Sequence, residues 1–381
     1  MRLLRGLYRE LANELHRERH HREVRALDCI AFLTYRCTSC CRTCTIWQRA
    51  GSGVGELSRE QWLEIVPGLA RYGLRSFEIF GGDALLRKDV IFDLTSACRE
   101  NGIATYFPTN ANLCDHDTVR RLIDSGLGTV YLSIDDVEEE HDRVRGVSGT
   151  FVKVRQALEN FAALRGGGES PRIIVCTTLS SLNFRNFPRL LEFLQHYPVD
   201  AVYPRPLGEF SRENVESSRL EGALPEPYFA SSDGKSHLMS PAELVEMYRM
   251  IEEVKRSRPG IYVNWRTYYS TTDDTFLRGE YPVKECRVAS TVVTINPNGD
   301  VVPCPFFRGY VIGNLRDEGV ESIWGNEKHR SFLEAQREGK LAICRNCNTR
   351  TYYTSLPETL GYYAKRALER VGMYRPGKCR E

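Results

Sequence analysis

Residues 33–47 read LTYRCTSCCRTCTIW and hold four cysteines, at positions 37, 40, 41 and 44. Cys37, Cys41 and Cys44 follow a C-x3-C-x2-C spacing. Three thiolates on one short loop suit a cubane iron–sulfur cluster, which usually takes four, so one iron would keep an open position for a small chelating ligand. The four cysteines can also be taken as two C-x2-C pairs, which would suit a structural zinc site. The spacing alone leaves both interpretations open.

The sequence around this loop alternates between strand and helix patterns. The predicted strands span residues 28–34, 75–80, 103–108, 129–135, 172–179 and 199–204, and the predicted helices between them span residues 58–73, 88–101, 115–126, 150–165 and 186–197. Such alternation predicts an α/β fold with a parallel sheet and right-handed crossovers. Six units favour a partial (β/α)6 barrel of the TIM type. In such barrels the chemistry lies at the carboxyl ends of the strands, where the cysteine loop is placed.

The remaining segments suggest a division of the chain into five parts. They are an amphipathic helix at 1–27, the barrel at 28–208, a polar loop or lid at 209–239, a linker helix with a small α+β domain at 240–350, and a helical tail at 351–381. The loop is rich in Gly, Pro and Ser, which is typical of a connection between domains.

The composition limits the class of protein. The chain has 381 residues, a net charge of +2 and 13 cysteines. It has no apolar run long enough to cross a bilayer and no secretory signal pattern, so we expect a cytoplasmic protein. In that compartment the cysteines indicate metal binding or redox chemistry rather than disulfides. The small net charge gives no strong field for binding nucleic acid.

Both ends of the chain are basic and amphipathic. Leucines at positions 3, 4, 7, 11 and 15 share one helical face, and residues 360–376 read LGYYAKRALERVGMYRP. Such helices can dock on an anionic membrane surface. Their charge is modest, so we favour two helices that pack on the open ends of the barrel.

Further motifs follow the later strands in order. They are FGGDALLRKDV at 80–90, PTNA at 108–111, LSIDD at 132–136 and HDRVRGVSGTF at 141–151. Together with the cysteine motif, this ordered set resembles the radical SAM superfamily. The resemblance implies that Cys37, Cys41 and Cys44 bind a [4Fe-4S] cluster whose open iron is chelated by the amino and carboxylate groups of S-adenosylmethionine (SAM). It also implies that Cys40, which lies between the ligand positions, is not a ligand.

The resemblance also implies a set of SAM-binding residues. These are Gly81, Gly82, Asp83, Asn110, Ser133, Asp135 and Arg145. The two glycines would let the backbone approach the methionine end of SAM, Asp83 replaces the usual Glu, and Arg145 is the candidate for the SAM carboxylate. Each polar residue has a simpler alternative: Ser133 as a strand-end cap, Asp135 as a helix cap and Arg145 in a surface ion pair.

A second cysteine group lies in the last third of the chain. Cys286 and Cys304 flank a hairpin signal at Asn298-Gly299, and Cys344 and Cys347 form a later C-x2-C pair. The hairpin would bring these cysteines together, and four thiolates would close either a cubane or a zinc ribbon. The spacing, with the intervening GYVIGNLRDEGVESIWGNEKHRSF, resembles the SPASM/twitch auxiliary domain. Only Cys379 follows, which implies the short form with one auxiliary cluster. Four other cysteines are expected in the core: Cys29, Cys98, Cys114 and Cys176.

The resemblance implies reductive cleavage of SAM to a 5′-deoxyadenosyl radical that removes a hydrogen atom from a substrate. We expect oxidation of a small polar molecule of the sugar or aminocyclitol type, with the auxiliary cluster as electron acceptor and an external donor of the flavodoxin or ferredoxin type. Arg205, past the sixth strand, is the candidate catalytic residue that contacts substrate, with Glu209 near it, although a surface arginine is the simpler alternative. A peptide-modifying, epimerising or lipid-modifying enzyme, or a metal-binding protein without turnover, stays open.

Overall fold

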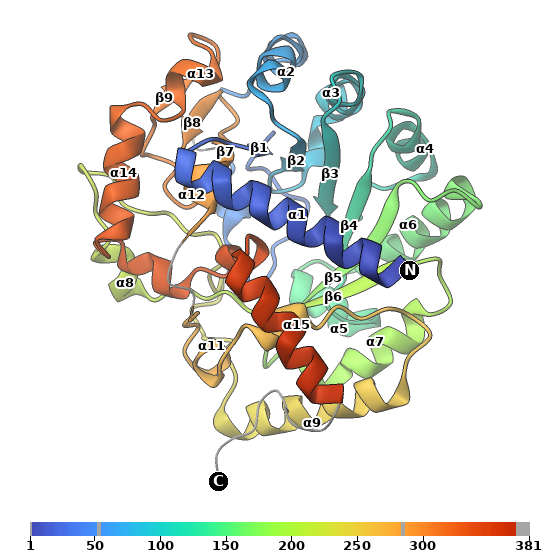
Figure 1. Ribbon diagram of the computed structural model, residues 1–381. Helices are drawn as coiled ribbons and strands as arrows, with labels where there is room; N and C mark the ends of the chain where they lie inside the picture. The colour runs from blue at the N-terminus through green and yellow to red at the C-terminus, as the bar shows by residue number, and fades with distance from the viewer. Residues whose placement is uncertain (1, 52–54, 283–285, 371–381) are drawn as a thin grey trace.

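The computed structural model describes residues 2–51, 55–282 and 286–370. These residues form one sheet in the order β6-β5-β4-β3-β2-β1-β7-β8-β9, with helices around its outside (Figure 1). The strands are β1 Asp28–Phe32, β2 Ser76–Phe80, β3 Ala104–Thr109, β4 Thr129–Ser133, β5 Arg172–Leu179, β6 Ala201–Pro206, β7 Val292–Ile295, β8 Asp300–Val302 and β9 Gly313–Asn314. Strands β1 to β6 pair in parallel, which confirms the predicted partial barrel.

The helices that connect these strands also follow the predicted pattern. Those of the barrel are α2 Arg59–Tyr72, α3 Lys88–Glu100, α4 His116–Asp124, α5 Glu138–Arg145, α6 Thr150–Arg165 and α7 Phe187–Leu194. The others are α1 Arg2–Glu23, α8 Arg212–Glu216, α9 Pro241–Ser257, α10 Arg266–Tyr269, α11 Asp273–Leu277, α12 Val288–Thr291, α13 Val320–Ile323, α14 Glu327–Arg337 and α15 Leu356–Arg370. Helix α5 was not expected, because its polar sequence EEEHDRVR shows little apolar periodicity.

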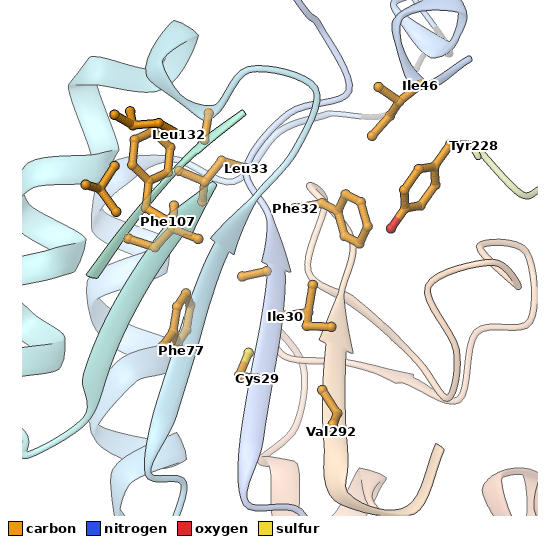
Figure 2. Close-up of a cluster of buried hydrophobic side chains, with 14 of the residues drawn as sticks. Cys29, Ile30, Phe32, Leu33, Ile46, Phe77, Phe107, Leu132, Tyr228 and Val292 are labelled. Atoms are coloured by element: carbon orange, nitrogen blue, oxygen red, sulfur yellow. The ribbon is translucent and has the colours of Figure 1, made fainter. Parts of the chain in front are cut away.

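The main core lies between the strands and the surrounding helices. Phe77 of β2, Phe107 of β3 and Leu132 of β4 are fully buried on the helix-covered face (Figure 2). Cys29, Cys98 and Cys114 are buried as predicted. Side chains alternate between the two faces of a strand, so the residues between these apolar ones point to the opposite, inner face of the barrel.

The C-terminal hairpin is part of the barrel sheet rather than a separate layer. Strand β7 pairs in parallel with β1, with Val292 beside Asp28, and β8 returns antiparallel to β7 through the predicted Asn298-Gly299 turn. Gly299 has a φ of +89°, which explains the glycine. All four residues of β7 are buried, as expected for a strand covered on both faces. The hairpin that lies between Cys286 and Cys304 is therefore hydrogen-bonded directly to the first strand of the barrel.

Helices α1 and α15 cross the amino ends of the strands (Figure 1). Arg17 of α1 forms an ion pair of 2.7 Å with Asp28 at the start of β1, and α1 contacts α12 and α15. The side chains of Leu3, Leu4 and Leu7 lie outside the described residues, as does Cys379. Leu15, on the predicted leucine face of this helix, is 56% exposed. No described helix is long and apolar enough to cross a membrane.

Residues 209–239, predicted as a loop or lid, contain only the short α8 as a regular element and are nevertheless packed against the barrel. Tyr228 and His237 are 5% and 4% exposed. Glu209 accepts a hydrogen bond of 3.1 Å from the backbone N–H of His237, so its carboxylate holds this segment. The expected role of Glu209 toward substrate at the barrel mouth stays a prediction.

Candidate metal and substrate site

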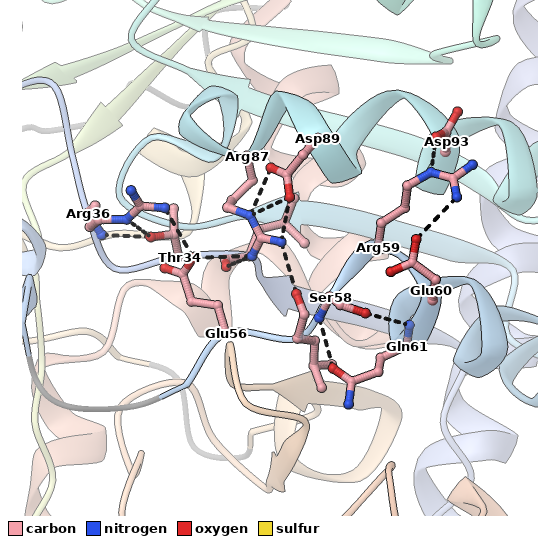
Figure 3. Close-up of polar contacts among 12 residues, drawn as sticks. Thr34, Arg36, Glu56, Ser58, Arg59, Glu60, Gln61, Arg87, Asp89 and Asp93 are labelled. Carbon is pink, nitrogen blue, oxygen red and sulfur yellow. Dashed lines mark hydrogen bonds and ion pairs between the residues drawn. The ribbon is translucent and has the colours of Figure 1, made fainter.

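The cysteine loop begins where β1 ends, and a buried arginine holds its first residues. Arg87 is 6% exposed and donates to the backbone carbonyls of Leu33 at 3.5 Å and Leu57 at 2.9 Å. It also forms ion pairs with Glu56 at 3.2 Å and Asp89 at 3.0 Å (Figure 3). A buried guanidinium with this many partners fixes the backbone around it. This role could not be predicted from the sequence, because Leu33, Glu56 and Leu57 lie thirty or more residues from Arg87 in the chain.

Gly81 and Gly82 pack against this same loop. A Cβ on Gly82 would lie 2.3 Å from the carbonyl oxygen of Arg36, and one on Gly81 would lie 2.6 Å from that of Thr34. The N–H of Gly82 donates to Thr34 at 3.0 Å, and that of Asp83 to Arg36 at 2.8 Å. The close approach that requires glycine is therefore made to the start of the cysteine loop. The approach of these glycines to the methionine end of SAM stays a prediction.

Asp83 and Asn110 hold the middle of the loop. Asp83 is 2% exposed and accepts a 2.5 Å hydrogen bond from the Thr38 hydroxyl. Burial raises the pKa of Asp83, and the Thr38 hydrogen bond opposes this rise. The amide nitrogen of Asn110 donates to Thr38 at 3.0 Å and lies 3.9 Å from the sulfur of Cys37. Both residues thus contact the loop that carries the candidate ligands.

Arg145 and Asp135 form a buried ion pair beside Cys41. The two side chains are 12% and 5% exposed and 3.0 Å apart, so the alternative of a surface ion pair is wrong. Arg145 also donates to the sulfur of Cys41 at 3.7 Å. Burial lowers the pKa of Arg145, but Asp135 and Cys41 outweigh this effect, so the pKa is raised and the guanidinium is charged. Its Nε is buried and has no hydrogen-bond partner among the described residues.

Ser133 ends β4 on the inner face, with Cys176 of β5 as its register partner. The hydroxyl of Ser133 forms no hydrogen bond within residues 2–51, 55–282 and 286–370. The Ser133 side chain is half-buried. A ligand at the carboxyl ends of the strands could therefore bond this hydroxyl.

The three predicted ligands lie close together, and Cys40 differs from them. Cys41 is buried, Cys37 and Cys44 are half-buried, and Cys40 is exposed. Burial raises the pKa of the Cys37 thiol to about 11 and that of Cys44 to about 12, and a neighbouring Cys41 thiolate adds to both shifts. Such thiols keep their protons at neutral pH unless a metal displaces them. An all-thiol donor set beside a charged arginine fits an iron–sulfur cluster.

The second cysteine group also comes together. Burial raises the pKa of Cys304, and the neighbouring Cys347, Cys286 and Cys344 raise it further. Burial likewise raises the pKa of Cys347 to about 12. In the described part of the chain no three His, Cys, Asp or Glu side chains are arranged to hold a single metal ion. The four thiols form a donor set of the kind that closes a cubane cluster.

Tyr228 lies between the two cysteine groups. Its carbonyl accepts a 2.8 Å hydrogen bond from Thr45, directly after Cys44, and its ring lies 5.2 Å from that of Phe306, two residues after Cys304. Figure 2 shows its ring beside Phe32 at the end of β1. The sequence pattern did not single out Tyr228, because the segment around it has no periodic signal.

The inner face of the barrel carries half-exposed polar side chains at mid-sheet positions. They are Glu78, Tyr106, Tyr131, Cys176, Tyr203 and Arg205. Helices cover the other face of these strands, so the exposure is toward the interior of the barrel. Cys176 was expected in the core and instead belongs to this face, which is the alternate face to that of Val175 and Thr177.

Arg205 points along the inner face and is not a free surface arginine. It donates to the Thr267 hydroxyl at 2.7 Å, and its guanidinium lies 5.2 Å from the ring centre of Tyr203 and 4.4 Å from that of Tyr352. Among the described residues it forms no ion pair with a carboxylate. A guanidinium held by two aromatic rings and one hydroxyl keeps donors available for an anionic ligand.

Comparisons with known proteins agree with this geometry. Residues 32–194 match the radical SAM superfamily, and residues 286–348 match the SPASM iron–sulfur cluster-binding domain. The chain is 25% identical over 360 residues to an AdoMet-dependent heme synthase of Methanosarcina barkeri, covering 91% of this chain and 96% of that protein. It is 25% identical over 336 residues to a PqqA peptide cyclase of Granulibacter bethesdensis, covering 84% and 79%.

The fold is also found in solved structures. The structure of anSMEcpe with bound AdoMet aligns with a TM-score of 0.62 at 16% identity, covering 92% of this chain and all of that one. The two matched domains contain the three barrel cysteines and the four C-terminal cysteines, in the order and on the elements described above. The chain therefore belongs to the radical SAM superfamily and carries a C-terminal SPASM-type iron–sulfur domain.

Proposed function

We propose that this protein removes a hydrogen atom from an organic substrate that carries a carboxylate and then oxidises it by one further electron. The radical SAM and SPASM domains imply a [4Fe-4S] cluster with SAM and auxiliary iron–sulfur binding. When bound, these groups supply a 5′-deoxyadenosyl radical and an electron acceptor. We propose that an external protein of the flavodoxin or ferredoxin type supplies the electron for cleavage of SAM.

The proposed ligands of the first cluster are Cys37, Cys41 and Cys44, and those of the second are Cys286, Cys304, Cys344 and Cys347. Arg145 would pair with the SAM carboxylate from its place beside Asp135 and Cys41. Ser133 would donate to or accept from SAM at the end of β4. The Asp83 and Asn110 side chains would act mainly by holding the loop, because Thr38 already engages both.

Arg205 is the single observation that carries the substrate proposal. A guanidinium on the inner face without a carboxylate partner is costly to desolvate unless a ligand supplies the negative charge. Tyr203 and Tyr352 hold its position, so a substrate carboxylate would meet a preorganised donor. Tyr131 and Tyr106 continue the aromatic surface across the strands, with ring centres 6.0 Å apart, which suits a flat or extended substrate body.

The relatives shift the substrate away from our first expectation. Those reported above are named for haem and peptide products, and no sugar or aminocyclitol appears among them. The heme synthase aligns over nearly its whole length. We therefore propose a carboxylate-bearing tetrapyrrole of the haem type as the first substrate class.

The test is turnover of iron coproporphyrin III, the compound that names another relative, by the reconstituted protein with SAM and a chemical reductant. We expect more 5′-deoxyadenosine and a product with altered mass. Arg205→Gln should raise KM for this probe at least tenfold, and Arg205→Lys should recover only part of the loss, because lysine lacks the bidentate fork. Equal KM in all three proteins would overturn the role of Arg205.

A peptide is the second candidate, favoured by the PqqA peptide cyclase among the relatives. It would meet the same arginine through a side-chain or terminal carboxylate. Stimulation of 5′-deoxyadenosine release by an acidic peptide, with none by the porphyrin, would select this candidate.

A further inference from the structure

Glu78 is an acidic side chain on the inner face of β2, and the proposed function has not used it. Its register partners are Ile30 of β1 and Tyr106 of β3. It is half-buried between the fully buried Phe77 and Ile79, so its carboxyl points to the side opposite the helix-covered core. Two residues further along β2, Phe80 ends the strand. Glu78 is therefore deeper in the barrel than Arg205, which lies near the carboxyl end of β6.

The surroundings of Glu78 contain no cation that pairs with it. Among the described residues it forms no ion pair, and its one side-chain hydrogen bond comes from Tyr106. The titratable groups that share its electrostatic environment are acids: Asp28, Cys29, Tyr106, Tyr131, Cys176, Tyr228, Tyr352 and Tyr353. The cations next to these groups include Arg205, beside Tyr131, Cys176 and Tyr352, and Arg17, beside Tyr353. An unpaired carboxyl at the half-exposed base of a barrel is expensive for stability, and such groups cluster at functional sites.

We propose that Glu78 is the proton acceptor of the oxidation, a catalytic residue at the opposite end of the substrate from Arg205. This inference rests on the proposed function. After loss of a hydrogen atom the substrate holds a carbon radical. The Glu78 carboxylate would accept a hydrogen of the neighbouring atom as a proton, and a double bond would form. The remaining electron would go to the oxidised iron–sulfur cluster that Cys286, Cys304, Cys344 and Cys347 would hold. Substrate thus loses two hydrogens and two electrons in total.

The ionisation of Glu78 suits this task. Burial raises its pKa to about 7, the Tyr106 hydrogen bond opposes the rise, and Asp28 adds to it. A carboxyl that titrates near neutral pH is present as a base in a large fraction of molecules and binds the proton well once it arrives. Removal of the Tyr106 hydroxyl should raise the pKa further, because the hydrogen bond favours the charged form.

The experiment has one arm that needs no turnover. Infrared difference spectra of the full chain, recorded between pH 5 and pH 9, should show a carboxyl that titrates near pH 7. The signal should vanish in Glu78→Gln and move to higher pH in Tyr106→Phe. Tyr131→Phe, on the same face but without a hydrogen bond to Glu78, is the matched control and should leave the midpoint unchanged. A spectrum identical in wild type and Glu78→Gln would overturn the proposal.

The second arm uses iron coproporphyrin III, SAM and reductant. Glu78→Gln should still release 5′-deoxyadenosine but form oxidised product about 100-fold more slowly, and Glu78→Asp should recover part of the rate. A Glu78→Gln protein that forms product as fast as wild type would reject Glu78 as the acceptor. Absence of any 5′-deoxyadenosine from wild type would instead reject the proposed function, and the infrared arm would still decide whether Glu78 titrates as proposed.

Discussion

Two residues at this site, Glu78 and Arg145, lower the stability of the folded state unless neighbouring groups compensate them. Glu78 is held where its charged form is disfavoured, and Arg145 has a buried donor without a partner. Asp135 compensates Arg145 through a 3.0 Å ion pair, whereas no described cation compensates Glu78. The difference matches the proposed roles: Arg145 stays charged throughout, and Glu78 exchanges a proton.

The uncompensated carboxyl predicts a pH-dependent stability. Its folded pKa of about 7 lies above the ordinary 4.5, so stability falls as pH rises through this interval and the penalty is complete above pH 7. Glu78→Gln removes the penalty, worth up to about 3 kcal/mol. The free energy of unfolding of Glu78→Gln should therefore exceed that of wild type at pH 8 and match it near pH 4.5. Denaturant titrations at both pH values measure this, and a difference independent of pH would count against the raised pKa.

At the scale of elements, the turn after β2 is built to receive the cysteine loop. Gly82 and Asp83 donate to the carbonyls of Thr34 and Arg36, while Arg87 on the following turn holds Leu33. The sequence predicted β2 and its glycines from their pattern. It could not predict that these glycines serve the loop, because the contact joins segments about fifty residues apart. Tyr228 was missed because the segment around it has no periodic signal.

This arrangement predicts that Gly82→Ala is damaging. The new Cβ would meet backbone at 2.3 Å, which no side-chain movement can relieve, so we expect a loss of about 1–3 kcal/mol in unfolding free energy. Gly68→Ala is the matched control: its Cβ would meet nothing nearer than 4.0 Å inside α2, and it should gain about 0.5–1 kcal/mol. Thermal unfolding of the two variants compares them directly. Equal melting temperatures would show that the turn yields easily.

At the scale of the whole molecule, one sheet carries both cysteine groups. The barrel strands were predictable because β-branched runs alternate with amphipathic stretches. The cysteine spacing indicated two metal-binding groups, and only the resemblance to the radical SAM superfamily implied which cysteines are ligands. The pairing of β7 with β1 could not be predicted, because it depends on the contact of residue 28 with residue 292, which leaves no local signal in the sequence. The pairing matters because the barrel and the C-terminal segment then share the neighbourhood of Tyr228, where Cys44 and Cys304 both act on its pKa.

Two separate clusters predict a simple metal count. Replacement of Cys37, Cys41 and Cys44 by Ala should leave about four irons per chain after anaerobic reconstitution, because the C-terminal thiols still close one cubane. Replacement of Cys286, Cys304, Cys344 and Cys347 should leave the barrel cluster. Zinc in the first variant, or no metal at all, would contradict the assignment of the C-terminal site.

The central claim is that the three-cysteine site cleaves SAM, and release of 5′-deoxyadenosine tests it most directly. The iron-loaded protein should release it from SAM with reductant under anaerobic conditions. Cys40→Ala should retain this release, because Cys40 is exposed and lies outside the C-x3-C-x2-C spacing, and Cys41→Ala should abolish it. Release by Cys41→Ala together with loss in Cys40→Ala, or no release from iron-loaded wild type, would contradict the account.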